Sequence, residues 1–185
     1  GLTVIGIGGG SEDTPVVSME DGDWRNLSLP ETVTTINDYA FVKAQQQNAN
    51  IIIPSTVSKI GAKAFYKSTI ASVKINGMKG EIGYLAFGNC SSLSNVIIKG
   101  NDLTIKEEAF SCSGIANLTL SGNVTIQKNA FKDAIGIKEL YLPNGITLEA
   151  YAFNGCSGIE VLESNMSTLA NNSFAGCTSI KTLIL

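Results

Sequence analysis

The sequence contains no histidine among its 185 residues. Histidine supplies the base of Ser-His-Asp and Cys-His nucleophilic sites and is a common zinc ligand, so its absence excludes those centres. Paired carboxylates alone can still support glycoside hydrolysis. The adjacent acids Glu107 and Glu108 have no second acid marked as their partner, however. We therefore expect a protein that is not an enzyme, with no catalytic, cofactor-binding or metal-binding residues.

The chain also lacks an excess of basic charge and any long hydrophobic run. It has 13 Lys and Arg against 16 Asp and Glu, a net charge of −3, so no overall basic field attracts nucleic acid or anionic lipid. The longest runs of Ile and Val, at 51–53 and 96–98, are far shorter than the ~20 apolar residues of a membrane helix. We expect no nucleic-acid partner and no membrane insertion within this segment.

Aromatic residues are few, at 7% of the chain, but the phenylalanines follow one spacing. They lie 24, 22, 23, 21, 22 and 21 residues apart, and all but the last follow an alanine. They are Phe41, Phe65, Phe87, Phe110, Phe131, Phe153 and Phe174. Such regular spacing is typical of a solenoid, in which every coil contributes one equivalent residue. The spacing predicts about seven stacked coils of 21–24 residues.

Each coil is expected to open with a short strand, since apolar residues flank a variable one at 27–29, 51–53, 73–75, 96–98, 118–120 and 140–142. Pro30, Pro54 and Pro143 follow three of these strands, as suits a residue without an amide donor. Coils without this proline are expected to be shorter or looser. A second extended piece and a tight helical turn around Ala-Phe complete the predicted coil. Stacking then pairs the strands about 4.8 Å apart and buries one Phe per coil.

The stretch from Leu29 to Phe41, L-P-E-T-V-T-T-I-N-D-Y-A-F, resembles the unit of the BspA-type leucine-rich repeat, L-P-x-x-(V/L)-x-x-I-x-x-x-A-F. The resemblance covers residues 27–185, in seven copies that keep one phase. Together with the spacing it predicts an α/β solenoid. This would be a right-handed stack of about seven coils with a parallel sheet on one face, mostly strand and turn with short helical turns.

Residues 1–26 fit the repeat poorly, and they are interpreted as an N-terminal cap or the remnant of a linker. Leu2, Thr3 and Val4 could form the first strand of a degenerate repeat, in line with residues 27–29. A solenoid needs an atypical unit over its first core layer, and Trp24, the only tryptophan, suits that role. Residues 27–185 form the predicted solenoid domain.

The four cysteines show no C-x-x-C spacing and so indicate no metal site. Cys90 and Cys112 lie in neighbouring predicted coils, and so do Cys156 and Cys177. Equivalent positions in adjacent coils are about 5 Å apart, which a disulfide can span. Parallel side-chain directions favour free thiols instead, because a buried cysteine also serves as a small hydrophobic residue. The sequence leaves both alternatives open.

The outer face of the first strands is the candidate binding surface, since alternation turns every second residue outward. The candidate protein-binding residues are Asn50, Ile52, Lys74, Asn95, Ile97, Asn117, Thr119, Glu139 and Tyr141. Asn mixed with Ile and Tyr makes this face more apolar than solubility requires. The competing interpretation is that its β-branched residues serve strand propensity alone.

The resemblance also implies a function, because members of this family are secreted or surface-attached, commonly in gut and oral Bacteroidetes, and some are adhesins. It implies a non-catalytic extracellular or cell-surface module that adheres to host or microbial proteins through the sheet face, with a glycan as an additional partner. The alternative is a structural spacer or glycan-binding accessory that displays another domain outside this segment. In either case we expect a monomer without cofactors, with any signal or anchor outside the segment.

Overall fold

The fold is that of a computed structural model, which describes residues 4–5, 11, 26–45 and 48–185. These residues contain twelve strands and no helix, and hence no helix that could cross a membrane. The strands are β1 Val4–Ile5, β2 Asn26–Ser28, β3 Thr35–Ile36, β4 Asn50–Ile53, β5 Lys59–Ile60, β6 Ser72–Ile82, β7 Asn95–Ile105, β8 Asn117–Ile126, β9 Glu139–Leu142, β10 Ile146–Leu148, β11 Val161–Ser164 and β12 Thr182–Ile184. The expected α/β class is therefore wrong, and the molecule is a β-solenoid of about seven coils.

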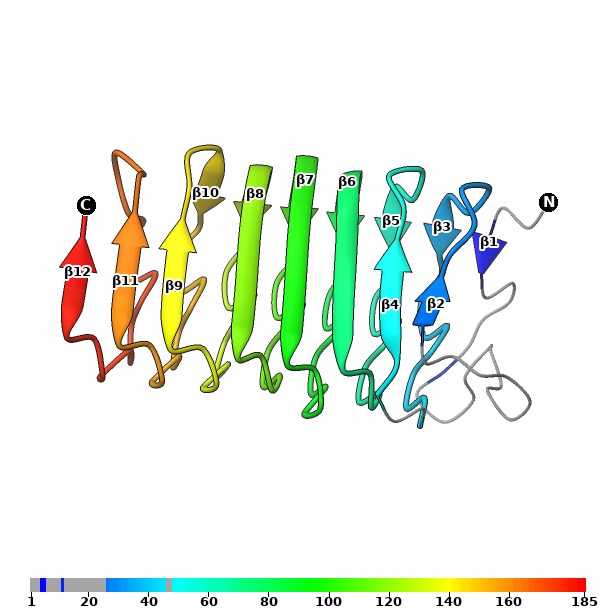
Figure 1. Cartoon of the computed structure of the whole chain (residues 1–185), viewed down its shortest axis with the longest axis horizontal. Helices are drawn as coiled ribbons and strands as arrows, with labels where there is room; N and C mark the ends of the chain where they lie inside the picture. Colours follow the sequence, from blue (N-terminus) through cyan, green and yellow to red (C-terminus); the bar gives the residue numbers. More distant parts are fainter. Residues whose placement is uncertain (1–3, 6–10, 12–25, 46–47) are drawn as a thin grey trace.

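The coils from β2 to β10 contribute to two parallel ladders, whereas β11 and β12 belong to the first ladder alone (Figure 1). The first ladder joins β2, β4 and the opening halves of β6, β7 and β8, while β9, β11 and β12 continue it as a separate three-stranded sheet. The second ladder joins β1, β3, β5, the closing halves of β6 to β8, and β10. The two strands of a coil point in opposite directions because the chain turns over between them. The expected parallel sheet is confirmed, with a second parallel ladder beside it.

Strand β1 lies in the second ladder, where Val4 pairs with Thr35 and Ile5 with Ile36. The degenerate-repeat interpretation placed Val4 in line with residues 27–29, and this alignment is wrong, because Val4 pairs with Thr35 instead. Most of residues 1–26, including Trp24, lies outside the described residues. The assignment of this segment to a cap or a linker stays a prediction.

Three prolines separate the two strands of their coils. Pro30, Pro54 and Pro143 follow β2, β4 and β9, which end at residues 28, 53 and 142. The third, fourth and fifth coils lack this proline, and there β6, β7 and β8 run on for 11, 11 and 10 residues. At the bend of β8, Gly122 has a φ of 77° and lies so close to Gly100 that a Cβ would collide with its carbonyl oxygen. The expectation of looser coils is wrong for these three, since a retained N–H extends the ladder. The seventh coil also lacks the proline, and there β11 ends at Ser164 without running on.

A column of phenylalanine rings runs through the core. Phe41, Phe65, Phe87, Phe110, Phe131 and Phe153 are each at most 1% exposed. Adjacent rings, including Phe174 at the end, have centroids 4.8–5.4 Å apart and planes within 5–8° of parallel. This spacing is close to the 4.7–4.9 Å between hydrogen-bonded strands. The predicted burial of one Phe per coil is confirmed for six coils, whereas Phe174 in the seventh is partly buried.

The chain around each Phe is not a helical turn, because the residues two before and two after the Phe have a left-handed backbone. In the second coil these are Lys63 and Lys67, with φ of 53° and 57°. Hydrogen bonds of the type i to i+3 close successive turns, from Ala64 N to Gly61 O (3.3 Å) and from Ser68 N to Phe65 O (3.0 Å). A positive φ at the third position is that of a type II turn. We call the five residues centred on each Phe the Phe turn.

The left-handed residues direct backbone groups along the stack. In the second coil the N–H groups of Lys63, Phe65 and Lys67 all donate to carbonyls of the next coil, at 2.8, 2.7 and 3.0 Å. The acceptor for Phe65 is Ala86, the residue before the next Phe, and it is completely buried. A helix would align these N–H groups with its own axis instead. Bonding between coils therefore replaces the expected helical turn, and the small alanine allows the close approach.

We predict that Phe110→Ala lowers the free energy of unfolding by about 3–5 kcal/mol, since it leaves a cavity between two stacked rings. Chemical denaturation measures this change. Phe174→Ala is the matched control and should cost clearly less, because Phe174 is only partly buried and stacks on Phe153 alone. Equal losses in the two variants would contradict a core that depends on the stack.

We also predict that Glu108→Gly leaves stability unchanged or raises it, because Glu108 has a φ of 55° and glycine adopts this conformation without strain. Glu107→Gly, at the residue just before this Phe turn, is the control. Glu107 has no such backbone conformation, so this variant should lose about 0.5–1 kcal/mol of unfolding free energy. Thermal unfolding of the two variants compares them directly. A lower midpoint for Glu108→Gly than for Glu107→Gly would contradict the left-handed turn.

Candidate binding surface

The outward positions of the first ladder form a flat strip, which we call the sheet face. Along β4, Ile51 and Ile53 are buried, whereas Ile52 between them is exposed. The same alternation occurs in β7 and β9. The sheet face therefore consists of two parallel rows, one at the first residue and one at the third residue of each strand.

The row at the third residue carries exposed apolar side chains. Ile52, Ile97 and Tyr141 are 37%, 43% and 44% exposed, although they belong to the large hydrophobic residues. Ile52 is in register with Lys74, Lys74 with Ile97, and Ile97 with Thr119. Four of the predicted residues thus lie side by side on four adjacent coils. In this row, one isoleucine lies on each side of Lys74.

The row at the first residue is an amide ladder, in which side chains bond to one another across coils. Asn50 Nδ2 donates to Asn26 Oδ1 (3.2 Å), and Ser72 Oγ donates to Asn50 Oδ1 (2.6 Å). Farther along, Asn117 Nδ2 donates to Asn95 Oδ1 at 2.8 Å. Part of the hydrogen-bonding capacity of the predicted asparagines is therefore used between coils. The sequence predicted that these asparagines recur at the same outward position of successive strands. It did not predict that they bond to one another, because such a bond forms only when the coils stack.

Glu139 and Tyr141 lie in a different sheet from the other predicted residues. Strand β9 pairs with β11 and is not hydrogen-bonded to β8, so the first ladder is interrupted between Thr119 and Tyr141. The hydroxyl of Tyr141 accepts a hydrogen bond from Asn165 Nδ2 at 2.8 Å. The nine predicted residues therefore form one group of seven over β4 to β8 and one pair on β9.

No cluster of three His, Cys, Asp or Glu side chains capable of holding a metal ion occurs in the described ranges. The cysteines there are all free thiols. Cys90 and Cys156 are buried, and each thiol donates to the carbonyl of a Phe one coil earlier, Cys90 to Phe65 and Cys156 to Phe131, both at 3.0 Å. Burial raises the pKa of Cys90 to about 11. The hydrogen bond with Cys177, together with burial, raises the pKa of Cys156.

The two disulfides left open by the sequence differ in geometry. Cys112 is exposed, and Ser113 occupies the slot that Cys90 fills in its own coil, donating from Oγ to Phe110 O at 2.7 Å. Cys90 and Cys112 therefore point to different sides of the chain, which disfavours a bridge. Cys156 and Cys177 occupy equivalent slots in neighbouring coils and remain thiols in this structure.

The chain belongs to the family of BspA type leucine rich repeat regions, whose model matches residues 19–134 and 121–185 in six copies. No curated protein matches the chain. Among solved structures, a leucine-rich repeat protein from Eubacterium ventriosum is 22% identical with a TM-score of 0.61, covering 78% of this chain and 44% of that one. A leucine-rich repeat protein from Bacteroides ovatus is 20% identical with a TM-score of 0.59, covering 86% and 48%.

A leucine rich cell surface protein from Faecalibacterium prausnitzii is 20% identical with a TM-score of 0.48, covering 79% of this chain and 49% of that one. This chain thus spans about half the length of the solved proteins that it matches. At these identities, the two structures with the higher TM-scores establish the leucine-rich repeat fold and nothing beyond it.

We predict that iodoacetamide at pH 8 modifies Cys112 in the folded protein and leaves Cys90 unmodified until the protein is unfolded. Cys112 is exposed, whereas Cys90 is buried and its raised pKa keeps it a thiol. Peptide mass spectrometry before and after denaturation measures both sites. Modification of Cys90 as fast as Cys112 would contradict the buried slot.

Proposed function

We propose that this chain is a non-catalytic interaction module, secreted or held at the cell surface, that binds a host or microbial extracellular protein through the sheet face. The row of Ile52, Lys74, Ile97 and Thr119 carries the proposal. A solenoid presents such rows as extended surfaces for partners, because each coil repeats the same side-chain position. Membership in the repeat family supports an interaction module, whereas the adhesive role and the extracellular location are parts of the proposal.

The composition of the row suits a protein partner. Protein interfaces combine an apolar centre with a polar rim. Ile52 and Ile97 supply the apolar centre, and the amide ladder of Asn50, Asn95 and Asn117 runs beside it as one rim. The sheet presents these side chains on paired strands, so little conformational entropy is lost when a partner covers them. Tyr141 on β9 would extend the contact to a second patch.

We predict that changing Ile52, Ile97 and Tyr141 together to Ser abolishes binding to the partner and leaves the fold intact. Single exposed substitutions change stability by about 0.5 kcal/mol or less. The unaltered protein is first screened by biolayer interferometry against purified host extracellular-matrix proteins and against whole bacterial cells. The variant is then measured against every target that binds.

The matched control is Ile135→Ser combined with Tyr151→Ser, which removes an isoleucine and a tyrosine that are 61% and 37% exposed away from the sheet face. This control should bind as the unaltered protein does. Binding that survives in the sheet-face variant, or that is lost equally in the control, would overturn the proposed surface. Circular dichroism and thermal unfolding verify that both variants are folded.

A further inference from the structure

A cleft of about 410 Å³ lies along the second ladder, away from the sheet face. Its lining includes Asp38, Lys59, Glu81, Tyr84, Lys106 and Gln127. The cleft spans adjacent coils, so its long direction follows the stack. It is separate from the residues assigned to protein binding.

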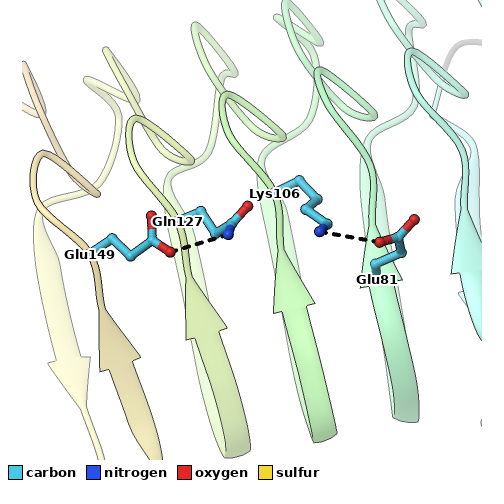
Figure 2. A network of polar contacts seen from close by, with 4 residues as sticks. All are labelled: Glu81, Lys106, Gln127 and Glu149. Atoms are coloured by element: carbon cyan, nitrogen blue, oxygen red, sulfur yellow. Dashed lines mark hydrogen bonds and ion pairs between the residues drawn. The ribbon is translucent and has the colours of Figure 1, made fainter.

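Lys106, Glu81 and Gln127 of this cleft make polar contacts across coils, Gln127 with Glu149 just beyond the lining (Figure 2). Lys106 Nζ lies 3.3 Å from Glu81 Oε2, and Gln127 Nε2 donates to Glu149 Oε1 at 3.1 Å. The side chains of Glu81 and Lys106 are each 39% exposed and therefore still reach solvent. Ammonium, amide and carboxylate groups alternate along the line, so donors and acceptors are both available. Such a mixture suits ligand hydroxyl groups, which both donate and accept hydrogen bonds.

The cleft continues as a row of hydroxyl groups farther along the second ladder. Glu81 is in register with Thr104, Thr104 with Thr125, and Thr125 with Thr147. A second cleft of about 400 Å³ is lined by these three threonines. Together the two clefts form a polar track that crosses several coils, which fits a linear polymer lying along the stack.

Tyr84, which lines the first cleft, adjoins a group of aromatic and cationic residues. Tyr84 is 46% exposed, and its carbonyl accepts a hydrogen bond from Lys63 N at 2.8 Å, so the backbone of Lys63 is its direct neighbour in the preceding coil. Lys63 Nζ and Lys67 Nζ lie 5.2 and 4.9 Å from the ring centroid of Tyr66. We call Lys63, Tyr66, Lys67 and Tyr84 the lysine–tyrosine cluster. The Tyr66 ring thus holds both ammonium groups close together.

The charge around this cluster differs from that of the whole chain. Residues 39–80 contain six lysines and no acidic residue, although the net charge of the protein is −3. Of these lysines, Lys74 lies on the sheet face and Lys79 lies 3.6 Å from Asp102, so the anionic group is assigned to Lys63 and Lys67 at the Tyr66 ring. The cleft beside it carries acids, Asp38, Glu81 and Glu107, that would repel a densely acidic peptide. A ligand that alternates anionic and uncharged polar units satisfies both regions.

We propose that the polar track and the lysine–tyrosine cluster bind an acidic polysaccharide, in which carboxylated sugars alternate with neutral ones. The carboxylates lie against Lys63 and Lys67, a sugar ring packs on Tyr84, and neutral hydroxyl groups bond to Gln127 and the threonine row. The proposal does not depend on the protein-binding role of the sheet face, since the two surfaces share no residue.

The probe is a hyaluronan oligosaccharide, which alternates a uronic acid with a neutral N-acetylated sugar. Lys63→Gln combined with Lys67→Gln should weaken its binding about tenfold and reduce the dependence of binding on salt. Lys128→Gln combined with Lys132→Gln removes the same charge around Phe131, three coils farther on, and should have little effect. Binding is measured by isothermal titration calorimetry at two salt concentrations.

Tyr84→Ser tests whether a sugar ring packs on Tyr84. Tyr141→Ser on the sheet face is the control, because the two tyrosines are 46% and 44% exposed. Only Tyr84→Ser should weaken hyaluronan binding, and it should leave binding to a protein partner unchanged. Thermal unfolding confirms that each variant is folded, so a loss of binding is separable from a loss of structure.

Three results would overturn the proposal. One is no hyaluronan binding by the unaltered protein at millimolar concentration. Another is an equal loss of hyaluronan affinity in the two double lysine variants, which indicates general electrostatic attraction. The third is tighter binding of polyglutamate than of hyaluronan, which assigns the cluster to an acidic peptide. Neutral dextran should bind more weakly than hyaluronan, since it lacks the carboxylates.

Discussion

The distance between neighbouring coils is the constraint on which the rest of this structure depends. Backbone hydrogen bonds join adjacent strands only at about 4.8 Å, and the phenylalanine rings stack at 4.8–5.4 Å between centroids. The two spacings agree, so the ladders and the aromatic column reinforce one another. The small residue before each Phe, alanine in six coils and Ser173 in the last, follows from this distance, as do the left-handed residues on either side of the Phe, because they let turn carbonyls reach the amides of the adjacent coil.

The same distance organises the outer surfaces, because any outward position recurs once per coil as a row. On the sheet face, one row became an amide ladder and its neighbour carries Ile52, Lys74 and Ile97. On the second ladder, the corresponding row passes from Lys59 and Glu81 to threonines. Since the core is the same in every coil, these rows can vary in chemistry without disturbing the fold. This independence is compatible with the two binding surfaces proposed for this chain.

Much of the core could be predicted from the sequence, since Phe spacing reports the coil length directly and apolar alternation reports which strand residues are buried. The turns could not, because Lys63, Glu108 and Tyr151 carry no local signal for a positive φ. Their conformation is selected by hydrogen bonds to the next coil. The candidate sheet face was located correctly in its outward orientation for Ile52 and Ile97, whereas its interruption before Tyr141 had no counterpart in the repeat pattern.

The sequence by itself determined the number of coils, the column of buried rings and the membership in a leucine-rich repeat family, because each depends on residues that recur at one period. Only the tertiary structure decided which side chains meet across coils: the bond from Asn117 to Asn95, the placement of Lys63 beside Tyr84, and the exposure of Cys112 while Cys90 is buried. Residues more than twenty positions apart become neighbours only after stacking. The physical reason is that register between coils is set jointly by all the ladders, and no single repeat contains that information.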